Sequence, residues 1–223
     1  MKLVIFGLTV SSSWGNGHAT LWRGLIDALA ARGHEVVFFE RDQPFYAAHR
    51  DMPELPGARL VLYPDWRSVA AAADRELAGA DVGMVTSYCP DALEAASLVC
   101  GGAGPLGVFY DLDTPVTLAR LAAGEPVGYV GPRGLADYDL VLSYTGGGAL
   151  EALTRELGAR RVAPLYGSVD PAVHHVGDLA MKLVRIGRGI ADVDVVRCAP
   201  PRHPVRVDPR GCACVQKGTQ PYF

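Results

Sequence analysis

Apolar runs of strand length alternate along the chain with amphipathic stretches of helix length. The first run, KLVIFGLT at residues 2–9, is almost continuously apolar, which is typical of a parallel strand buried on both faces. Six further runs predict strands, at residues 35–40, 58–63, 81–87, 105–111, 139–144 and 160–167. Apolar residues at helical spacing predict helices at 19–32, 66–80, 91–99 and 147–159. This alternation predicts a Rossmann-like α/β domain, a mostly parallel sheet with helices on both faces.

The alternating pattern ends near residue 175. From 176 to 223 there are eight Lys or Arg against four Asp and no Glu, and three of the five cysteines, with little helical periodicity. Residues 1–175 carry the remaining thirteen basic and twenty acidic side chains, so the sign of the net charge changes at this point. We therefore expect a folded domain over 1–175 and an irregular basic tail over 176–223.

The loop after the first predicted strand, SSSWGNGHAT at residues 11–20, is rich in small residues and leads into the first helix. Such a loop exposes backbone N–H groups to a ligand, usually a phosphate or a sugar. His18 follows Gly15, Asn16 and Gly17, and an imidazole can take a proton from a hydroxyl near neutral pH. His18 is therefore the candidate catalytic residue; the alternative is a residue at the helix start that only hydrogen-bonds the loop.

The carboxyl ends of the predicted strands should meet at one edge of the sheet, where ligands of such sheets bind. Polar or glycine residues follow most of these strands and are brought to that edge. Gly15, Asn16 and Gly17 are candidate substrate-binding residues in the first loop. The other candidates are Glu40, Ser87, Tyr88, Asp111, Asp113, Tyr144, Thr145, Gly146 and Ser168.

The GNGHAT stretch followed by Glu40 invites comparison with the dinucleotide-binding fingerprint G-x-G-x-x-G. It departs from that fingerprint because Thr20 replaces the third glycine and because residues 11–14 make the loop too long for the tight turn. An NAD-linked oxidoreductase is thus the weakest of the functional hypotheses.

Two motifs raise the question of a metal. Asp111 and Asp113 form a D-x-D pair that could hold a divalent cation on a nucleotide sugar, but we favour a local role in which Asp113 or Thr114 caps a helix that has Pro115 at its first position. The tail residues Cys198, His203, Cys212 and Cys214 do not have a standard zinc spacing. We therefore expect no metal and no cofactor.

Composition excludes several classes of protein. The net charge of −3 gives no basic surface of the kind that nucleic acid requires. No apolar stretch reaches the roughly 18 to 20 residues of a membrane-spanning helix, and the N-terminus lacks the regions of a secretory signal. The five cysteines are odd in number and scattered, which argues against a disulfide framework. We expect a cytoplasmic protein without nucleic-acid partners.

Six stretches together resemble the N-terminal half of a GT-B glycosyltransferase, close to the bacterial CgeB-like group, over residues 1–175. They are VIFGLTVSSSWGNGHATLWRGL, HEVVFFERDQPFYAAHRD, VTSYCPDA, VFYDLDTPVTLARL, GLADYDLVLSYTGG and PLYGSVDP. The resemblance implies an acceptor-side domain, with Gly15 to His18 facing a cleft and His18 as base on the acceptor hydroxyl. It also implies a nucleotide-sugar donor whose diphosphate leaves without a required metal.

In GT-B enzymes a second, donor-binding domain follows the first, and residues 164–174 look like the hinge between the two. The 48 residues after His175 do not show the pattern of such a domain, which suggests a truncated gene or a shifted reading frame. We therefore expect a missing C-terminal donor domain and an apolar face where it would dock. The alternative is a non-catalytic module that binds a sugar or nucleotide without turnover.

Overall fold

A computed structural model describes residues 1–102 and 104–167 of the chain. Ser168, most of the hinge-like segment 164–174, the basic tail 176–223 and the four tail residues considered for zinc lie outside the described residues. No helix in the described part of the chain is long and apolar enough to cross a membrane.

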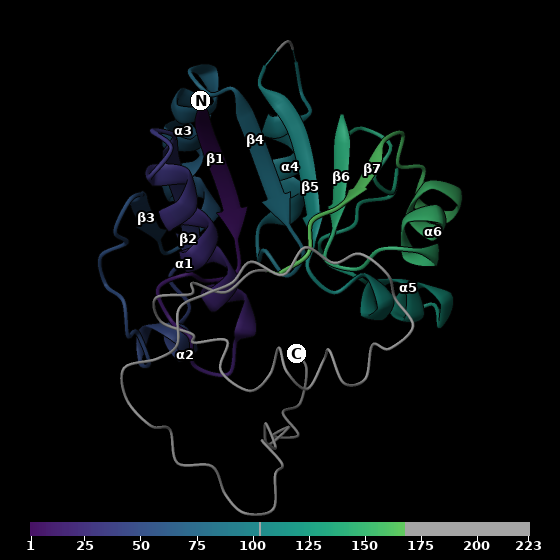
Figure 1. The fold of residues 1–223 in the computed structure, drawn as a ribbon, viewed down its shortest axis with the longest axis horizontal. Coiled ribbons are helices and arrows are strands. Elements are labelled where there is room, and N and C mark those ends of the chain that lie inside the picture. Colours follow the sequence, from purple (N-terminus) through teal and green to yellow (C-terminus); the bar gives the residue numbers. More distant parts are fainter. Residues whose placement is uncertain (103, 168–223) are drawn as a thin grey trace, which may run out of the picture. The chain divides into compact units, whose positions relative to one another are not determined.

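A seven-stranded sheet with strand order β3-β2-β1-β4-β5-β6-β7 forms the centre of the domain (Figure 1). All six strand pairs are parallel, so the predicted fold class is confirmed. All seven predicted strands occur, although β7 is only three residues long. The strands are β1 Lys2–Gly7, β2 Glu35–Arg41, β3 Arg59–Tyr63, β4 Val82–Thr86, β5 Leu106–Asp111, β6 Leu140–Ser143 and β7 Val162–Pro164.

The helices divide between the two faces and the carboxyl edge of the sheet. Apolar side chains of α1 pack on one face, and those of α3, α4 and α6 pack on the other. The short helix α2 and helix α5 lie beyond the arrowheads of the strands (Figure 1). The helices are α1 Gly17–Ala30, α2 Pro44–Ala47, α3 Trp66–Ala78, α4 Ala92–Val99, α5 Thr114–Ala122 and α6 Gly148–Leu157.

Alternation along the central strands produces two apolar layers. Phe6 and Phe39 stack with ring centroids 4.9 Å apart on the face covered by α3 and α4. On the opposite face Phe38 packs against Trp22 of α1, with centroids 5.6 Å apart. Burial of each such side chain contributes about 1.5–3 kcal/mol, and this burial fixes α1, and with it the loop that precedes it, over the centre of the sheet.

The boundaries of α1 follow from local chemistry. The Asn16 side chain accepts a hydrogen bond from the backbone N–H of His18 at 3.0 Å and caps the helix, which begins at Gly17, two residues before the predicted start. Gly33, with φ of +75°, follows the last turn and allows the chain to reverse into β2.

The expectation for α5 is correct for the capping position, which Asp113 holds, but wrong for the position of Pro115 and for the role of the Asp113 carboxylate. Pro115 occupies the second helical position rather than the first, because the helix begins at Thr114. Asp113 holds the capping position, but its carboxylate makes no capping hydrogen bond and is engaged elsewhere, as described below.

Candidate functional site

The loops at the carboxyl edge of β1, β4 and β5 bring most of the predicted site residues together. Glu40 at the end of β2 organises the first of these loops. Its Oε1 accepts hydrogen bonds from the hydroxyls of Thr9 (2.8 Å) and Ser11 (2.5 Å), and its Oε2 accepts from the backbone N–H groups of Val10 (2.7 Å) and Ser11 (3.0 Å). The side chain is fully buried. Glu40 therefore holds the loop in place and does not face a ligand, contrary to our expectation of a substrate-binding residue.

The glycine loop itself has exposed and buried parts. Gly15 and Gly17 are exposed, and a Cβ at either position would meet nothing within 4 Å. Gly15 has φ of +63°, so it is the backbone conformation that favours glycine there. Asn16 is buried, and its amide donates to the carbonyl of Thr9 at 3.4 Å in addition to capping α1. The two glycines, together with the neighbouring Trp14, are thus the accessible part of the loop.

His18 lies in the first turn of α1 with its ring beside that of Tyr88, the centroids being 5.5 Å apart. Its Nδ1 is buried and has no hydrogen-bond partner. Burial lowers the pKa of His18 below its ordinary value of 6.5, and the negative charge of Asp113 opposes this to a smaller extent. The imidazole is therefore neutral at pH 7 and able to accept a proton.

Tyr88 connects His18 to the loop after β5. Its hydroxyl donates to Oδ2 of Asp113 at 3.2 Å, and burial raises the pKa of the phenol, so the proton stays on the tyrosine. Tyr88 has φ of +64°, a conformation shared by no other non-glycine residue in the described part of the chain. Such a backbone conformation costs about 1–3 kcal/mol and persists where the surroundings impose it.

Asp111, two residues before Asp113, is fully buried. Its Oδ1 accepts from the backbone N–H of Asp113 and from the Thr117 hydroxyl, each at 3.1 Å, whereas its Oδ2 is buried without a partner. Burial raises the pKa of Asp111. Ser87 is also fully buried, and its hydroxyl accepts from the N–H of Leu112 at 2.9 Å. Asp111 and Ser87 thus support the loop that carries Asp113.

Among the described residues, no group of three or more His, Cys, Asp or Glu side chains that could hold a metal ion is found.

Tyr144, Thr145 and Gly146 lie at the end of β6. The hydroxyl of Ser143 accepts from the N–H of Thr145 at 3.1 Å and donates to its carbonyl at 2.7 Å, which closes a tight turn. The Tyr144 side chain is exposed, and a Cβ on Gly146 would collide with the hydroxyl of Tyr166. These residues are at the predicted edge, but the structure records no contact between them and His18.

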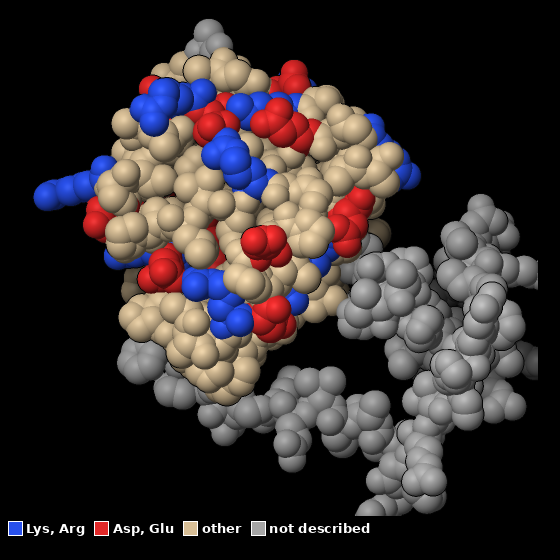
Figure 2. Space-filling model, turned by 90° about the vertical axis from the view of Figure 1, so that its left-hand side faces the viewer, with Lys and Arg blue, Asp and Glu red and all other residues tan. Residues whose placement is uncertain are grey.

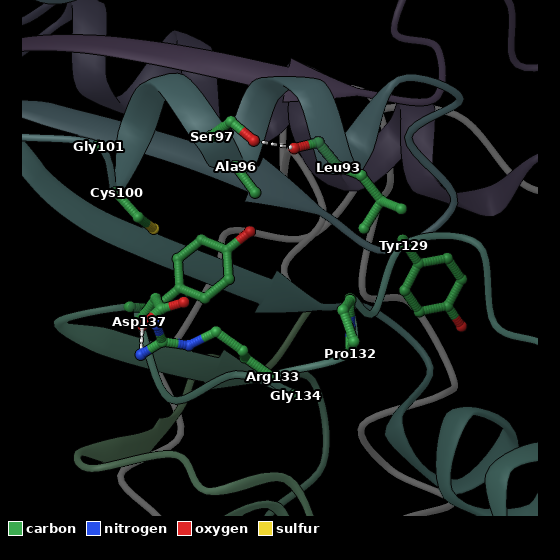
Figure 3. Close-up of a pocket in the computed structure, with 12 residues that line it drawn as sticks. Leu93, Ala96, Ser97, Cys100, Gly101, Tyr129, Pro132, Arg133, Gly134 and Asp137 are labelled. Atoms are coloured by element: carbon green, nitrogen blue, oxygen red, sulfur yellow. Dashed lines mark hydrogen bonds and ion pairs between the residues drawn. The ribbon is translucent and has the colours of Figure 1, made fainter.

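Three features were not found from the sequence. Helix α2 carries Phe45 and lies near Trp14 of the glycine loop, with the two ring centroids 5.0 Å apart. Arg23 forms an ion pair with Asp51 at 2.7 Å. A cavity of about 430 Å³ runs along α4 (Figure 3).

In Figure 3, Leu93, Tyr129 and Pro132 lie at one end of the cavity, and Cys100 and Asp137 at the other. The cavity is on the face of the sheet opposite α1. Tyr129, which lines the cavity, also reaches the edge described above: its hydroxyl is hydrogen-bonded to that of Thr117 at 2.9 Å, and its ring lies 5.2 Å from the ring of Tyr88.

No family model matches the chain, and no curated protein matches its sequence. The interpretation of the site therefore rests on its geometry: a neutral imidazole at a helix start, next to a glycine loop, with a carboxylate and a phenol at its side.

Proposed function

We propose that residues 1–175 form the acceptor-side domain of a glycosyltransferase, which moves a sugar from a nucleotide-sugar donor to a hydroxyl. The observation that carries the proposal is the environment of His18. Burial keeps its ring neutral, the nearby charge of Asp113 favours the protonated form, and the open backbone of Gly15 and Gly17 leaves room for a ligand.

In the proposed reaction His18 takes the proton from the acceptor hydroxyl as its oxygen attacks the anomeric carbon of the donor sugar. The bond from that carbon to the diphosphate oxygen breaks, and the nucleoside diphosphate leaves with the electron pair. Asp113 stabilises the imidazolium that forms, because its charge raises the pKa of His18. Tyr88 holds the Asp113 carboxylate by its hydrogen bond.

The N-terminus of α1 supports the part of this proposal that concerns the departing nucleoside diphosphate. A helix of 14 residues directs unsatisfied N–H groups and a partial positive charge to its N-terminus. Those groups favour the negative charge that develops on a departing diphosphate. No metal is required in this scheme, and a donor-binding domain would supply the remaining contacts to the nucleotide.

The test measures release of nucleoside diphosphate by the full chain from UDP-, GDP- and TDP-sugars, in the presence of a panel of hydroxyl acceptors, with a GT-B donor-binding domain added in a parallel series. His18→Ala should lower the rate about 10²- to 10⁴-fold, the usual contribution of a general base. His34→Ala, a change of the same kind at the opposite edge of the sheet, is the control and should leave the rate unchanged. Equal rates for the wild type and His18→Ala would refute the role of His18.

A non-catalytic binding module would instead show saturable binding of a nucleotide or sugar without any release of diphosphate. NAD serves as the negative ligand in the same series. Because Glu40 is fully buried within the loop, it is not available to a ribose hydroxyl, and we expect no NAD binding.

A further inference from the structure

Three aromatic side chains form an exposed surface beside the glycine loop. Trp14 stacks on His49 with ring centroids 4.2 Å apart and an interplanar angle of 25°, and Phe45 meets Trp14 edge-on at 5.0 Å. We call Trp14, Phe45 and His49 the aromatic platform. Trp14 is 44% exposed and Phe45 42% exposed, which is a large apolar area for side chains of this size.

Hydrogen bonds made by Ser12, Ser13 and His49 hold the aromatic platform in one arrangement. The Ser12 hydroxyl donates to the carbonyl of His49 at 2.8 Å, and Nδ1 of His49 is 2.8 Å from the carbonyl of Phe45. Ser13, next to Trp14, donates through its N–H (3.1 Å) and its hydroxyl (2.5 Å) to Asp51. The platform is therefore preorganised, so that a ligand binding there would not need to order the rings.

Charged side chains border the platform. Asp51 is paired with Arg23, and Asp42 with Arg50 at 2.5 Å, and both carboxylates are partly exposed. Figure 2 shows an uncharged lobe at the lower end of this side of the molecule, at the level of α2 in Figure 1, with acidic and basic side chains directly above it. A contiguous exposed apolar surface with a polar border marks an interaction site.

We propose that the aromatic platform binds a sugar ring of the acceptor, so that the acceptor is itself a carbohydrate. This inference rests on the proposed function. The C–H groups on one face of a pyranose carry a small positive charge that suits the negative face of an indole, and its hydroxyls can donate to the carboxylates of Asp42 and Asp51. Aromatic side chains combined with a few polar groups are typical of a small-molecule site, and this combination suits a polyhydroxyl ring.

The position of the platform agrees with this role. Trp14 lies in the loop before α1 and His18 in its first turn, four positions apart, and the accessible glycines Gly15 and Gly17 lie between them. A ring stacked on Trp14 would place the next part of the acceptor over the glycines and toward the imidazole. The platform would thus select the acceptor, and His18 would act on it.

The test follows the indole N–H signals of the full chain by NMR during titration with methyl glucosides, galactosides, mannosides and N-acetylglucosaminides, and with the matching disaccharides. We expect saturable shifts of the Trp14 signal with at least one sugar, and none of the Trp22 signal, whose side chain is only 2% exposed. Trp14→Ala and Phe45→Ala should each weaken binding at least tenfold, measured by isothermal titration calorimetry because the first variant lacks the Trp14 signal. The control Leu106→Ala, at a 43% exposed apolar residue on the amino edge of the sheet, should not change it.

Circular dichroism and thermal melting confirm that each variant is folded, and the two platform variants give independent readings. Absence of any saturable Trp14 shift, or binding that survives both Trp14→Ala and Phe45→Ala, would overturn the inference. His18-dependent transfer to simple alcohols without sugar binding would refute the platform and leave the proposed function intact. Sugar binding that depends on Trp14, without transfer to any acceptor, would support the platform and refute the proposed function.

Discussion

The ring of Tyr88 lies 5.5 Å from the ring of His18, and its hydroxyl reaches Asp113 at 3.2 Å. A residue of the loop after β4 thereby joins the start of α1 to the loop after β5. This connection is what places a carboxylate within electrostatic range of the imidazole, although the two belong to segments almost a hundred residues apart.

The titration of His18 tests this connection. We expect its pKa to lie below 6.5 in an NMR titration, and Asp113→Asn to lower it further, because the negative charge that opposes the effect of burial is removed. Asp137→Asn, which changes a carboxylate at the α4 cavity, should leave the pKa of His18 unaltered. A His18 pKa that rises in Asp113→Asn would contradict this description of the site.

The lowered pKa of His18 predicts how the free energy of unfolding depends on pH. The folded chain binds the His18 proton less readily than the unfolded chain does, so the contribution of the neutral ring is present above about pH 6.5 and is lost as the pH falls below that value. Urea unfolding of wild type and His18→Gln between pH 7.5 and 5 should show a smaller loss of stability in the variant. Parallel pH profiles for the two proteins would argue against a buried, neutral ring.

Removal of the Tyr88 hydroxyl should have a modest effect. Tyr88→Phe loses the hydrogen bond to Asp113 but keeps the ring beside His18. We expect the free energy of unfolding to fall by about 0.5–1.5 kcal/mol, measured by urea denaturation. Tyr166→Phe, at a side chain that is 65% exposed, is the control and should be neutral.

Glu40→Gln should be the more damaging change, since two backbone N–H groups and two hydroxyls converge on the carboxylate. An amide presents its own N–H₂ group to donors and leaves some of them without an acceptor, at a cost of about 1–3 kcal/mol. The amides of Val10 and Ser11 should exchange with solvent faster. Glu35→Gln, at an exposed residue of the same strand, should change stability by less than about 0.5 kcal/mol; similar losses for both variants would contradict the role assigned to Glu40.

Gly134→Ala tests the segment that borders the α4 cavity. Gly134 has φ of +63°, and a Cβ there would collide with the backbone carbonyl of Leu157. The left-handed conformation alone costs about 1–2 kcal/mol for alanine, and the collision adds to it, so thermal unfolding should occur at a clearly lower temperature. Gly128→Ala, where a Cβ would meet nothing within 4 Å, should leave the melting temperature nearly unchanged.

The elements that depend on a local pattern of apolar residues were predicted correctly from the sequence. Apolar runs of six to eight residues predicted all seven strands, because both faces of this sheet are covered and the side chains on both faces are apolar. The helical spacing of apolar residues explains why the start of α1 was predicted to within two residues, whereas the capping role of Asn16 was not predicted.

Features that depend on partners far along the chain were not predictable in this way. Glu40 looked like a ligand-facing residue at a strand end, and only the fold shows that the loop of Thr9 to Ser11 covers its carboxylate. Likewise, the contact of Trp14 with His49 joins residues 35 positions apart. Helix α2, with four residues, is too short to produce a helical periodicity.

The place of β1 in the sheet has a consequence for how the domain is made. β1 is an interior strand, third in the sheet order, and pairs with β2 on one side and β4 on the other, in a register that sets Leu3 opposite Val82. During synthesis its apolar residues Val4 to Phe6 therefore lack one neighbour until the ribosome has released the chain beyond Thr86. Pairing over such sequence distances is slow, and until it occurs the nascent chain presents a strand that chaperones and other unfinished chains can bind.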